Sequence, residues 1–380
     1  MVAIDSYAGG DGRLSPLSTP SATRAVLEAH GIGTKYTLGQ NFLVNDDVLK
    51  KIIALAEVGE NDRVLEVGPG IGTLTIALLK HAASVIAIER DPDLPVVLAD
   101  TLHPWREKFA LIEKDALDVT EGDIVAAVAE IGADTGYSDR ASSAANETAQ
   151  WAVSQSEDCL SESGYPVAPP QEDLQLSLPS KLVANLPYAV AATVVLDYFE
   201  SFPFLDSATI MVQKEVADRM AAAVGTKNYG AYTVKLGLYA EPVGRFAVGP
   251  GNFFPPPRVD SAVIRLNRRV PLMADGSAAT PEVVAAAALM ADAAFTNRRK
   301  TIANSCKTYF SGRGSILLGV ADSSAAEGAP TIALPDGAAT AERLPAIFEA
   351  AAIDPRRRGE TLTQQEFLAL GAALLKVTAA

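Results

Sequence analysis

Short runs of apolar residues alternate along this chain with segments whose apolar residues recur on one helical face. Five runs are predicted to be buried strands: residues 63–67, 84–88, 109–112, 182–184 and 208–212. Asn45 can cap a helix that carries Leu49 and Ile52 on its apolar face, and residues 74–81 also have helical spacing. Because short buried strands separated by helices are typical of parallel sheets, the pattern predicts a doubly wound α/β domain.

The pattern changes after residue 269, where Ala-rich stretches at 282–295 and 363–377 predict helices. We therefore expect an α/β domain over residues 23–269 and a smaller all-helical C-terminal domain over residues 270–380. Residues 1–22 are expected to form a disordered tail.

Two segments, about 132–180 and 311–340, lack a sustained apolar period and are predicted to be low-complexity insertions. The first is acidic, because residues 121–180 contain eleven acidic residues and one basic residue, Arg140. The net charge of −14 argues at first against nucleic acid binding. Since most of that charge lies in one segment, the total says little about the remaining surface.

The composition is that of a soluble globular protein, with 48% hydrophobic and 21% charged residues, and 380 residues suffice for two domains. No run approaches the length of a membrane span, and the N-terminus lacks the pattern of a secretory signal. Cys159, Cys306 and three histidines are scattered. We expect no metal site, no membrane partner and a cytoplasmic location.

A glycine-rich turn, Glu66-Val67-Gly68-Pro69-Gly70-Ile71-Gly72, follows the first strand and leads into a helix. Glycines let the backbone turn sharply and approach a ligand closely. Glu89 ends the second strand, where a carboxylate can accept from ribose hydroxyls, and Asp115 follows the third, where it can accept from an adenine amine. Either acid alone could be a solvated strand end or a helix cap. Together with the turn they predict a nucleoside site.

The identity of the nucleoside follows from Pro69, which removes one amide from the glycine-rich turn. Backbone amides are what cradle a pyrophosphate such as that of NAD, so the proline disfavours NAD. S-adenosyl-L-methionine carries no phosphate and is the expected cofactor.

The fourth predicted strand ends on Asn185-Leu186-Pro187-Tyr188. The Asn side chain offers a donor and an acceptor, the proline fixes the local backbone, and the Tyr ring can stack on a base. The alternative is an ordinary turn with a Pro and a half-buried Tyr. Combined with the nucleoside site, the tetrapeptide predicts methyl transfer to the amine of a nucleobase.

Several stretches between residues 19 and 370 occur in a fixed order: 38–43, 66–72, 185–188, 252–261, 294–301 and 353–356. Together they resemble the rRNA adenine dimethyltransferase family that acts on small-subunit ribosomal RNA. The resemblance implies a Rossmann-like class I S-adenosylmethionine-dependent methyltransferase sheet with helices on both faces. It also implies the product, two adjacent adenosines near the 3′ end of 16S rRNA, each dimethylated on its exocyclic amine.

The resemblance further implies roles for individual residues. Cofactor contacts would come from Asn41, Leu43, Gly68, Glu89, Asp115 and Asn185. The target base would be held by the catalytic group Asn185, Leu186, Pro187, Tyr188, Phe253 and Phe254. One of the two Phe rings would stack on the base opposite Tyr188, and core packing is the alternative for the other.

Basic residues around the start of the helical domain are candidates for binding RNA phosphates, although each could equally be a solvated charge. They are Arg265, Arg268, Arg269, Arg298, Arg299, Lys300 and Lys307. The expected partner is small-subunit rRNA within immature small ribosomal subunits, bound by a monomer with a role in subunit biogenesis.

Three alternatives stay open at this point. An enzyme that methylates an adenine of large-subunit (23S) rRNA and confers antibiotic resistance would share the cofactor turn and a similar tetrapeptide. A DNA-adenine or protein-glutamine methyltransferase usually has Asn-Pro-Pro-Tyr where this chain has Leu186. A non-catalytic ribosome assembly factor would not need Gly68, Glu89, Asp115 and Asn185 all present.

Overall fold

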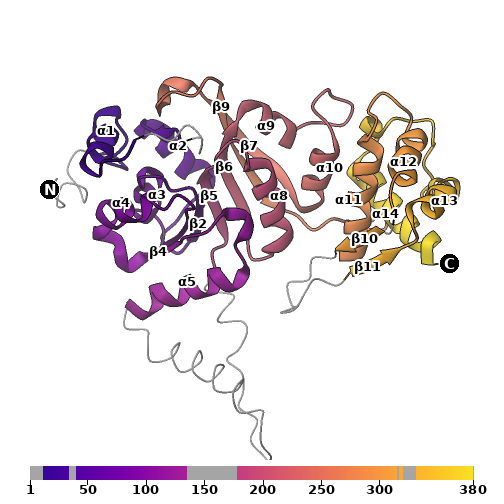
Figure 1. Ribbon diagram of the computed structural model, residues 1–380, viewed down its shortest axis with the longest axis horizontal. Helices are drawn as coiled ribbons and strands as arrows, with labels where there is room; N and C mark the ends of the chain where they lie inside the picture. The colour runs from indigo at the N-terminus through magenta and orange to yellow at the C-terminus, as the bar shows by residue number, and fades with distance from the viewer. Residues whose placement is uncertain (1–11, 34–39, 135–177, 315, 320–330, 380) are drawn as a thin grey trace, which may run out of the picture. The chain divides into compact units, whose positions relative to one another are not determined.

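The computed structural model describes residues 12–33, 40–134, 178–314, 316–319 and 331–379 (Figure 1). It divides into two compact units. The first comprises residues 1–191, 204–212 and 246–263, and the second comprises residues 192–203, 213–245 and 264–380. The division differs from the boundary expected at residue 269, because segments at 192–203 and 213–245 pack with the C-terminal part.

The main sheet has seven strands in the order β4-β3-β2-β5-β6-β9-β7. Its strands are β2 (Arg63–Val67), β3 (Ser84–Ile88), β4 (Phe109–Ile112), β5 (Lys181–Asn185), β6 (Ser207–Gln213), β7 (Ala240–Val248) and β9 (Ser261–Arg268). The pairs β2–β3, β3–β4, β2–β5 and β5–β6 are parallel. The chain moves outward from β2 to β4 and returns at β5 on the other side of β2. The carboxyl ends of β2 and β5 therefore flank the switch point, where doubly wound sheets bind ligands.

The strands predicted at residues 63–67, 84–88 and 109–112 are confirmed with the same bounds, and the other two are confirmed to within one residue at each end. All five residues of β3 are buried, as expected for a parallel strand covered on both faces. Asn45 caps α2 as predicted, since its Oδ1 accepts from the amides of Asp47 at 2.9 Å and Val48 at 3.2 Å.

The first unit also contains the helices α1 (Pro20–Ala29), α2 (Asp46–Ala56), α3 (Thr73–Leu79), α4 (Leu94–Thr101) and α5 (Glu121–Asp134), and short 3₁₀ turns η3 (His103–Lys108), η4 (Ala116–Asp118) and η5 (Pro250–Asn252). A second, two-stranded antiparallel sheet pairs β1 (Phe42–Leu43) with β8 (Phe253–Phe254). This pairing joins segments more than two hundred residues apart in the chain.

The expectation of a disordered tail over residues 1–22 is wrong for residues 12–22. Leu17 is fully buried in the core of the first unit, and α1 begins at Pro20. The segment before α1 is held by Asp46, whose Oδ1 accepts from the amides of Leu14 at 2.8 Å and Ser15 at 3.3 Å. This order depends on a carboxylate thirty residues away, which the local composition does not reveal.

The second unit is built mainly of helices (Figure 1). They are α8 (Ala191–Ser201), α9 (Lys214–Met220), α10 (Ala231–Tyr239), α11 (Pro281–Phe295), α12 (Ile302–Ser311), α13 (Gly337–Ala350) and α14 (Gln364–Ala379), with the 3₁₀ turn η6 (Gly359–Thr361). The predicted helices at 282–295 and 363–377 correspond to α11 and α14. Among the described residues, no helix is both long and apolar enough to cross a membrane.

Two predictions for this region need correction. The C-terminal part is not all-helical, because β10 (Ile316–Gly319) pairs with β11 (Thr331–Leu334) in an antiparallel ribbon. The stretch 311–340 is correspondingly more structured than a low-complexity insertion, since it contains this ribbon and the start of α13. Ile316 and Leu318 are buried and alternate with exposed residues, as in a strand with one covered face. The surrounding Gly- and Ala-rich composition made these two short strands difficult to predict. Residues 135–177, the central part of the predicted acidic insertion, lie outside the described residues.

Helices α11 and α14 of the second unit approach each other closely. A Cβ at Gly371 of α14 would lie 2.6 Å from Ala287 N and 2.6 Å from Val283 O of α11. Both neighbours are backbone atoms, which cannot rotate away. The two helices can approach this closely only because residue 371 has no side chain.

We predict that Gly371→Ala destabilises the second unit by about 1–3 kcal/mol, the usual range for overpacking a core. Urea unfolding of the full chain measures the effect. Gly122→Ala in α5 is the matched control, because its Cβ would meet only Thr120 Oγ1 at 3.7 Å. That substitution should be neutral or slightly stabilising, since alanine favours helix more than glycine does. Equal stability of Gly371→Ala and wild type would contradict the close contact.

Candidate active site

The glycine-rich turn follows directly after the last residue of β2. Gly68 N donates to Ile88 O at 2.9 Å, so the ladder between β2 and β3 continues into the turn. Gly68, Gly70 and Gly72 have φ of 72°, 61° and 89°, the left-handed region that side chains disfavour. The turn ends where Gly72 caps α3. Three left-handed glycines at alternate positions thus leave backbone without side chains at residues 68, 70 and 72 of this turn.

The tetrapeptide at the end of β5 lies directly against this turn. A Cβ at Gly68 would be 3.6 Å from Pro187 Cδ and 3.8 Å from Asn185 O. The structure therefore brings together the two segments from which the sequence predicted cofactor binding and base binding.

The amide of Asn185 has a defined orientation. Its Nδ2 donates to Asn41 O at 3.2 Å. The donor end of the side chain is thus directed at the protein, and the acceptor Oδ1 makes no hydrogen bond to another described residue. Leu186 is buried, and its amide donates to Met211 O at 3.1 Å. The Leu186 side chain therefore anchors the turn, and only its carbonyl is placed for a polar role.

Tyr188 is held by a residue that the sequence reasoning missed. Its hydroxyl lies 2.6 Å from Oγ of Ser261, the fully buried first residue of β9. Burial raises the pKa of Tyr188, so the ring stays neutral. The only sequence signal for this contact was the position of Ser261 at the end of the 252–261 motif.

The two phenylalanines differ in exposure. Phe42 pairs with Phe254 and Leu43 with Phe253 in the small sheet of β1 and β8. Phe253 and Leu43 are 4% and 3% exposed and belong to the core, whereas Phe254 is only partly buried. Of the two Phe rings, Phe254 is thus the one available to a base.

Glu89 lies almost fully buried at the end of β3. Its Oε1 accepts from the amides of Arg90 and Asp91, both at 2.9 Å. Burial raises the pKa of this carboxyl, and the two amide hydrogen bonds act in the opposite direction. Gln40, next to Asn41 in the chain, donates its Nε2 to Asp91 Oδ2 at 2.7 Å. The segment predicted to contact the cofactor is therefore tied to the strand end that carries Glu89.

Asp115 is a helix cap, the alternative left open for it, and its contact to an adenine amine stays a prediction. Its Oδ1 accepts from Leu117 N at 3.2 Å and so caps η4, while Oδ2 lies 2.8 Å from an Arg90 guanidinium nitrogen. The amide hydrogen bond, and then the Arg90 contact, lower the pKa of Asp115. The carboxylate is charged and half-exposed beside β4, so it remains able to accept from a ligand amine.

A buried carboxyl at Glu66 is a further site group. Glu66 was used only to mark the start of the glycine motif, yet it is 1% exposed and burial raises its pKa to about 8. Its Oε2 has no hydrogen-bond partner among the described residues. A buried acceptor without a partner beside a bare glycine turn suits a ligand that brings a donor or a positive charge.

These residues fit S-adenosylmethionine. The turn offers close backbone approach, Glu66 and Glu89 are buried acceptors, and Pro69 leaves the turn short of the amides that a pyrophosphate needs. Fold and site together define a Rossmann-like S-adenosylmethionine-dependent methyltransferase.

Comparison with known proteins assigns the family. The family model described as "Ribosomal RNA adenine dimethylase" matches residues 33–330. A ribosomal RNA small subunit methyltransferase A from Geobacillus sp. (strain WCH70) is 33% identical over 95% of this chain and 98% of its own length. The protein of the same name from Enterococcus faecalis (strain ATCC 700802 / V583) is 33% identical over 95% and 97%. The chain belongs to the ribosomal RNA adenine dimethylase family, and its substrate is ribosomal RNA.

Solved structures agree on the fold. A dimethyladenosine transferase from Plasmodium falciparum has a TM-score of 0.55 and 20% identity, and covers 88% of this chain and 98% of its own. The 23S rRNA methyltransferase ErmE has a TM-score of 0.50 and 20% identity, covering 88% and 99%. At this identity the similarity concerns the fold alone.

We predict that Glu66 makes the stability of the protein fall as pH rises. In the folded protein the carboxyl keeps its proton up to about pH 8, whereas its ordinary pKa is 4.5. At a pH between these two pKa values, unfolding releases a proton from Glu66. The free energy of unfolding therefore declines from about pH 4.5 to about pH 8 and then levels off. Glu66→Gln lacks this titration, so its stability relative to wild type should increase across that window.

Thermal unfolding of both proteins without cofactor, from pH 5 to pH 9, measures the difference. Glu60→Gln is the control, because Glu60 is exposed and its profile should run parallel to wild type. A Glu66→Gln profile that also runs parallel to wild type would show that Glu66 ionises as freely in the folded protein as in the unfolded chain.

Proposed function

We propose that the protein transfers methyl groups from S-adenosylmethionine to the exocyclic amines of two adjacent adenosines near the 3′ end of small-subunit (16S) ribosomal RNA. Relatives named ribosomal RNA small subunit methyltransferase A, which align with 95% of the chain, support this substrate. The observation that carries the chemistry is the orientation of Asn185, whose acceptor end is available beside the glycine turn.

The reaction needs a more nucleophilic amine. An adenine amine is a poor nucleophile because its lone pair is delocalised into the ring. Asn185 Oδ1 and the Leu186 carbonyl would accept its two hydrogens, so that the nitrogen becomes pyramidal and its lone pair points at the methyl group. No strong base is required, since the proton can leave after the methyl group arrives. Positioning of this kind contributes roughly 7–11 kcal/mol in favourable cases.

The cofactor supplies an electrophilic methyl group when bound. We assign its binding to Asn41, Gly68, Glu66, Glu89 and Asp115. Glu89 would accept from the ribose hydroxyls, Asp115 from the adenine amine, and Glu66 from a donor near the glycine turn. Leu43 would act through the core, since it is 3% exposed.

The target base must first leave its RNA stack, which costs a few kcal/mol. Tyr188 and Phe254 would offset this by stacking, at roughly 1–3 kcal/mol per base. The hydrogen bond to Ser261 fixes the Tyr188 ring, so the stacking surface does not have to be ordered when the base arrives.

We predict that Asn185→Ala lowers the single-turnover rate of methyl transfer at least about 100-fold, the usual effect of removing one hydrogen-bonding group that acts on the reacting atoms. Cofactor affinity, measured by calorimetry, should change by no more than a few fold. Asn304→Ala, which removes an exposed amide from α12, is the control and should retain the wild-type rate. A wild-type rate in Asn185→Ala with intact cofactor binding would overturn the proposal.

The predicted RNA-binding residues separate into side chains that bond to other parts of the second unit and side chains without such partners among the described residues. Arg268 donates to Phe199 O at 2.9 Å and Phe202 O at 2.7 Å, and so caps the carboxyl end of α8. Arg298 pairs with Glu360 at 2.8 Å and donates to Thr226 O at 3.0 Å. These two side chains hold the second unit together, which makes them poor candidates for phosphate binding.

Two further candidates are also engaged within the protein. Arg269 contacts Gln364 Oε1 at 3.4 Å, and Arg265 Nε donates to Asn267 Oδ1 at 3.0 Å. Arg299, Lys300 and Lys307 are exposed and have no ion pair among the described residues. Of the predicted set, these three keep the properties of phosphate-binding residues.

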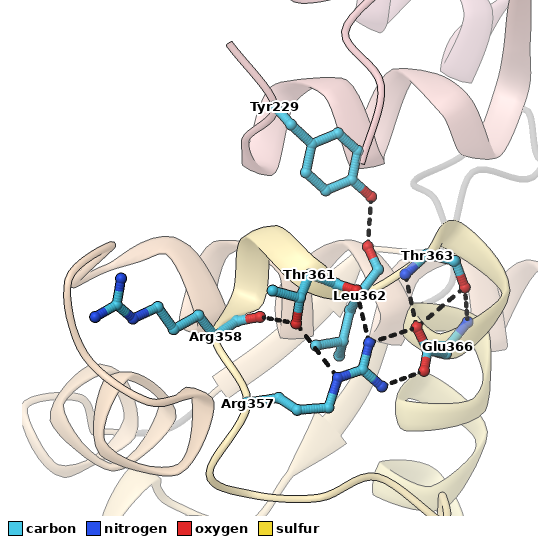
Figure 2. A network of polar contacts seen from close by, with 7 residues as sticks. All are labelled: Tyr229, Arg357, Arg358, Thr361, Leu362, Thr363 and Glu366. Atoms are coloured by element: carbon cyan, nitrogen blue, oxygen red, sulfur yellow. Dashed lines mark hydrogen bonds and ion pairs between the residues drawn. The ribbon is translucent and has the colours of Figure 1, made fainter. Parts of the chain in front are cut away.

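Figure 2 adds Arg358, which sequence reasoning had missed. In the figure, Arg357 points into a network with Thr361 and Glu366, whereas the guanidinium of the exposed Arg358 points away from it. The consecutive arginines at 356–358 gave no indication of which side chain faces solvent.

The exposed cations are brought together by backbone contacts between three loops. Ile302 N donates to Arg357 O at 2.7 Å, and Gly225 N donates to Glu360 O at 2.8 Å. These bonds join the turn before α12, the loop at 354–361 and the turn at 223–229. We name the resulting set of exposed cations the basic face: Lys227, Arg299, Lys300 and Arg358. We assign RNA phosphate binding to it.

We predict that Arg299→Ala, Lys300→Ala and Arg358→Ala combined reduce the slope of log affinity for small-subunit RNA against log salt by about 2, since each lost phosphate contact removes about 0.7–0.9. Binding measured over a series of KCl concentrations gives the slope. Lys376→Ala, an exposed cation near the far end of α14, should leave it unchanged. Arg268→Ala should lower the unfolding temperature without altering the slope. An unchanged slope in the triple variant would remove the basic face from RNA binding.

The physical form of the substrate is part of the proposal: a monomer acting in the cytoplasm on immature small ribosomal subunits. Methyl transfer to immature small subunits, to naked small-subunit RNA and to large-subunit RNA should be compared side by side. The proposal expects the immature subunit to be the best substrate and the large-subunit RNA to be inert.

A further inference from the structure

The exposed side chain of Arg24, on α1, lies against the base-binding part of the site. Its guanidinium carbon is 5.2 Å from the centroid of the Phe254 ring, within the range of a cation–π contact. No ion pair or hydrogen bond joins Arg24 to another described residue. Glu28 lies one helical turn further along α1, but these two described residues form no ion pair. Arg24 therefore keeps its donors available while it stacks on Phe254.

The position of Arg24 is fixed by the packing of α1. Thr19 caps the helix by accepting from Ala22 N at 3.2 Å, and Thr23 Oγ1 donates to Leu17 O at 3.1 Å. Val26 and Leu27 are buried in the core of the first unit and anchor the helix there. Helix α1 precedes residue 33, where the match to the family model begins.

The chemistry of the guanidinium suits one partner. It is flat, so it can lie on an aromatic ring, and its fork of N–H groups matches phosphate oxygens. A nucleotide whose base enters the pocket beside Phe254 keeps its sugar and phosphates at the pocket entrance. Exposed Arg258, four residues after Phe254, adds a second cation on the same loop.

We propose that Arg24 is a positioning residue for the RNA substrate: it stacks on Phe254 and binds a backbone phosphate next to the extruded adenosine. This inference rests on the proposed function, because it requires an adenosine in the pocket. Arg24 sets where the nucleotide backbone enters, and takes no part in the chemistry at the amine.

The test measures binding of a single-stranded fragment of small-subunit rRNA that contains the target adenosines, in the presence of S-adenosylhomocysteine and over a series of KCl concentrations. Arg24→Ala should weaken binding about tenfold and reduce the salt slope by about 0.7. Arg24→Lys should retain the slope, because its charge remains, while binding more weakly than wild type. Affinity for S-adenosylhomocysteine alone and the unfolding temperature should not change.

Arg106→Ala is the matched control. Arg106 is an exposed cation of the same unit, on the turn η3 that leads into the amino end of β4, and its removal should leave the slope as in wild type. An Arg24→Ala slope equal to wild type would overturn the inference. Loss of cofactor affinity or of stability together with RNA binding would also overturn it, since α1 would then act only as a structural support. Wild-type methyl transfer by Asn185→Ala is the separate result that defeats the proposed function.

Discussion

The site depends on the adjacency of two turns, after β2 and after β5, at the switch point of the sheet. A Cβ at Gly68 would lie in ordinary van der Waals contact with Pro187, 3.6 Å from its Cδ, but the left-handed φ of Gly68 disfavours a side chain there. A side chain at residue 68 would therefore strain the backbone of the turn that faces Asn185 and Pro187. The parallel pairing of β2 with β5 fixes where the two turns emerge, so the cofactor end and the base end of the site follow from one topological feature.

A second structural constraint on the candidate site is the pairing of β1 with β8. The pairing of β1 with β8 puts Asn41 next to Asn185 and leaves Phe254 partly exposed while it buries Phe253. Two short strands of two residues each would be unstable alone. They persist because Leu43 and Phe253 enter the core of the first unit.

The sequence predicted the central strands well because strands covered on both faces are continuous apolar runs, as in β3. It failed where order comes from distant partners. The segment around Leu17 is held by Asp46, and β10 is recognisable only from the core that receives Ile316. These partners are fixed by the fold and leave no local pattern.

The candidate site was predicted in part for the same reason. Glycines and acids at strand ends are visible in a sequence, so Gly68 and Glu89 could be assigned. The side-chain partners of cations are not visible. Arg268 has the same charge as Arg299, but its partners are backbone carbonyls at a helix end, which no residue name encodes.

If Asn185 binds the target base as proposed, its donation to Asn41 O has a consequence for the choice of base. With its NH2 group directed at Asn41 O, the side chain turns its oxygen toward the proposed base, and the Leu186 carbonyl would offer a second acceptor. Guanine and hypoxanthine carry an oxygen where adenine carries its amine. Either base would therefore place its oxygen beside the two protein oxygens, and none of the three acceptors would have a hydrogen-bond donor. The proposed arrangement would thereby discriminate between purines by polarity, although their shapes are nearly the same.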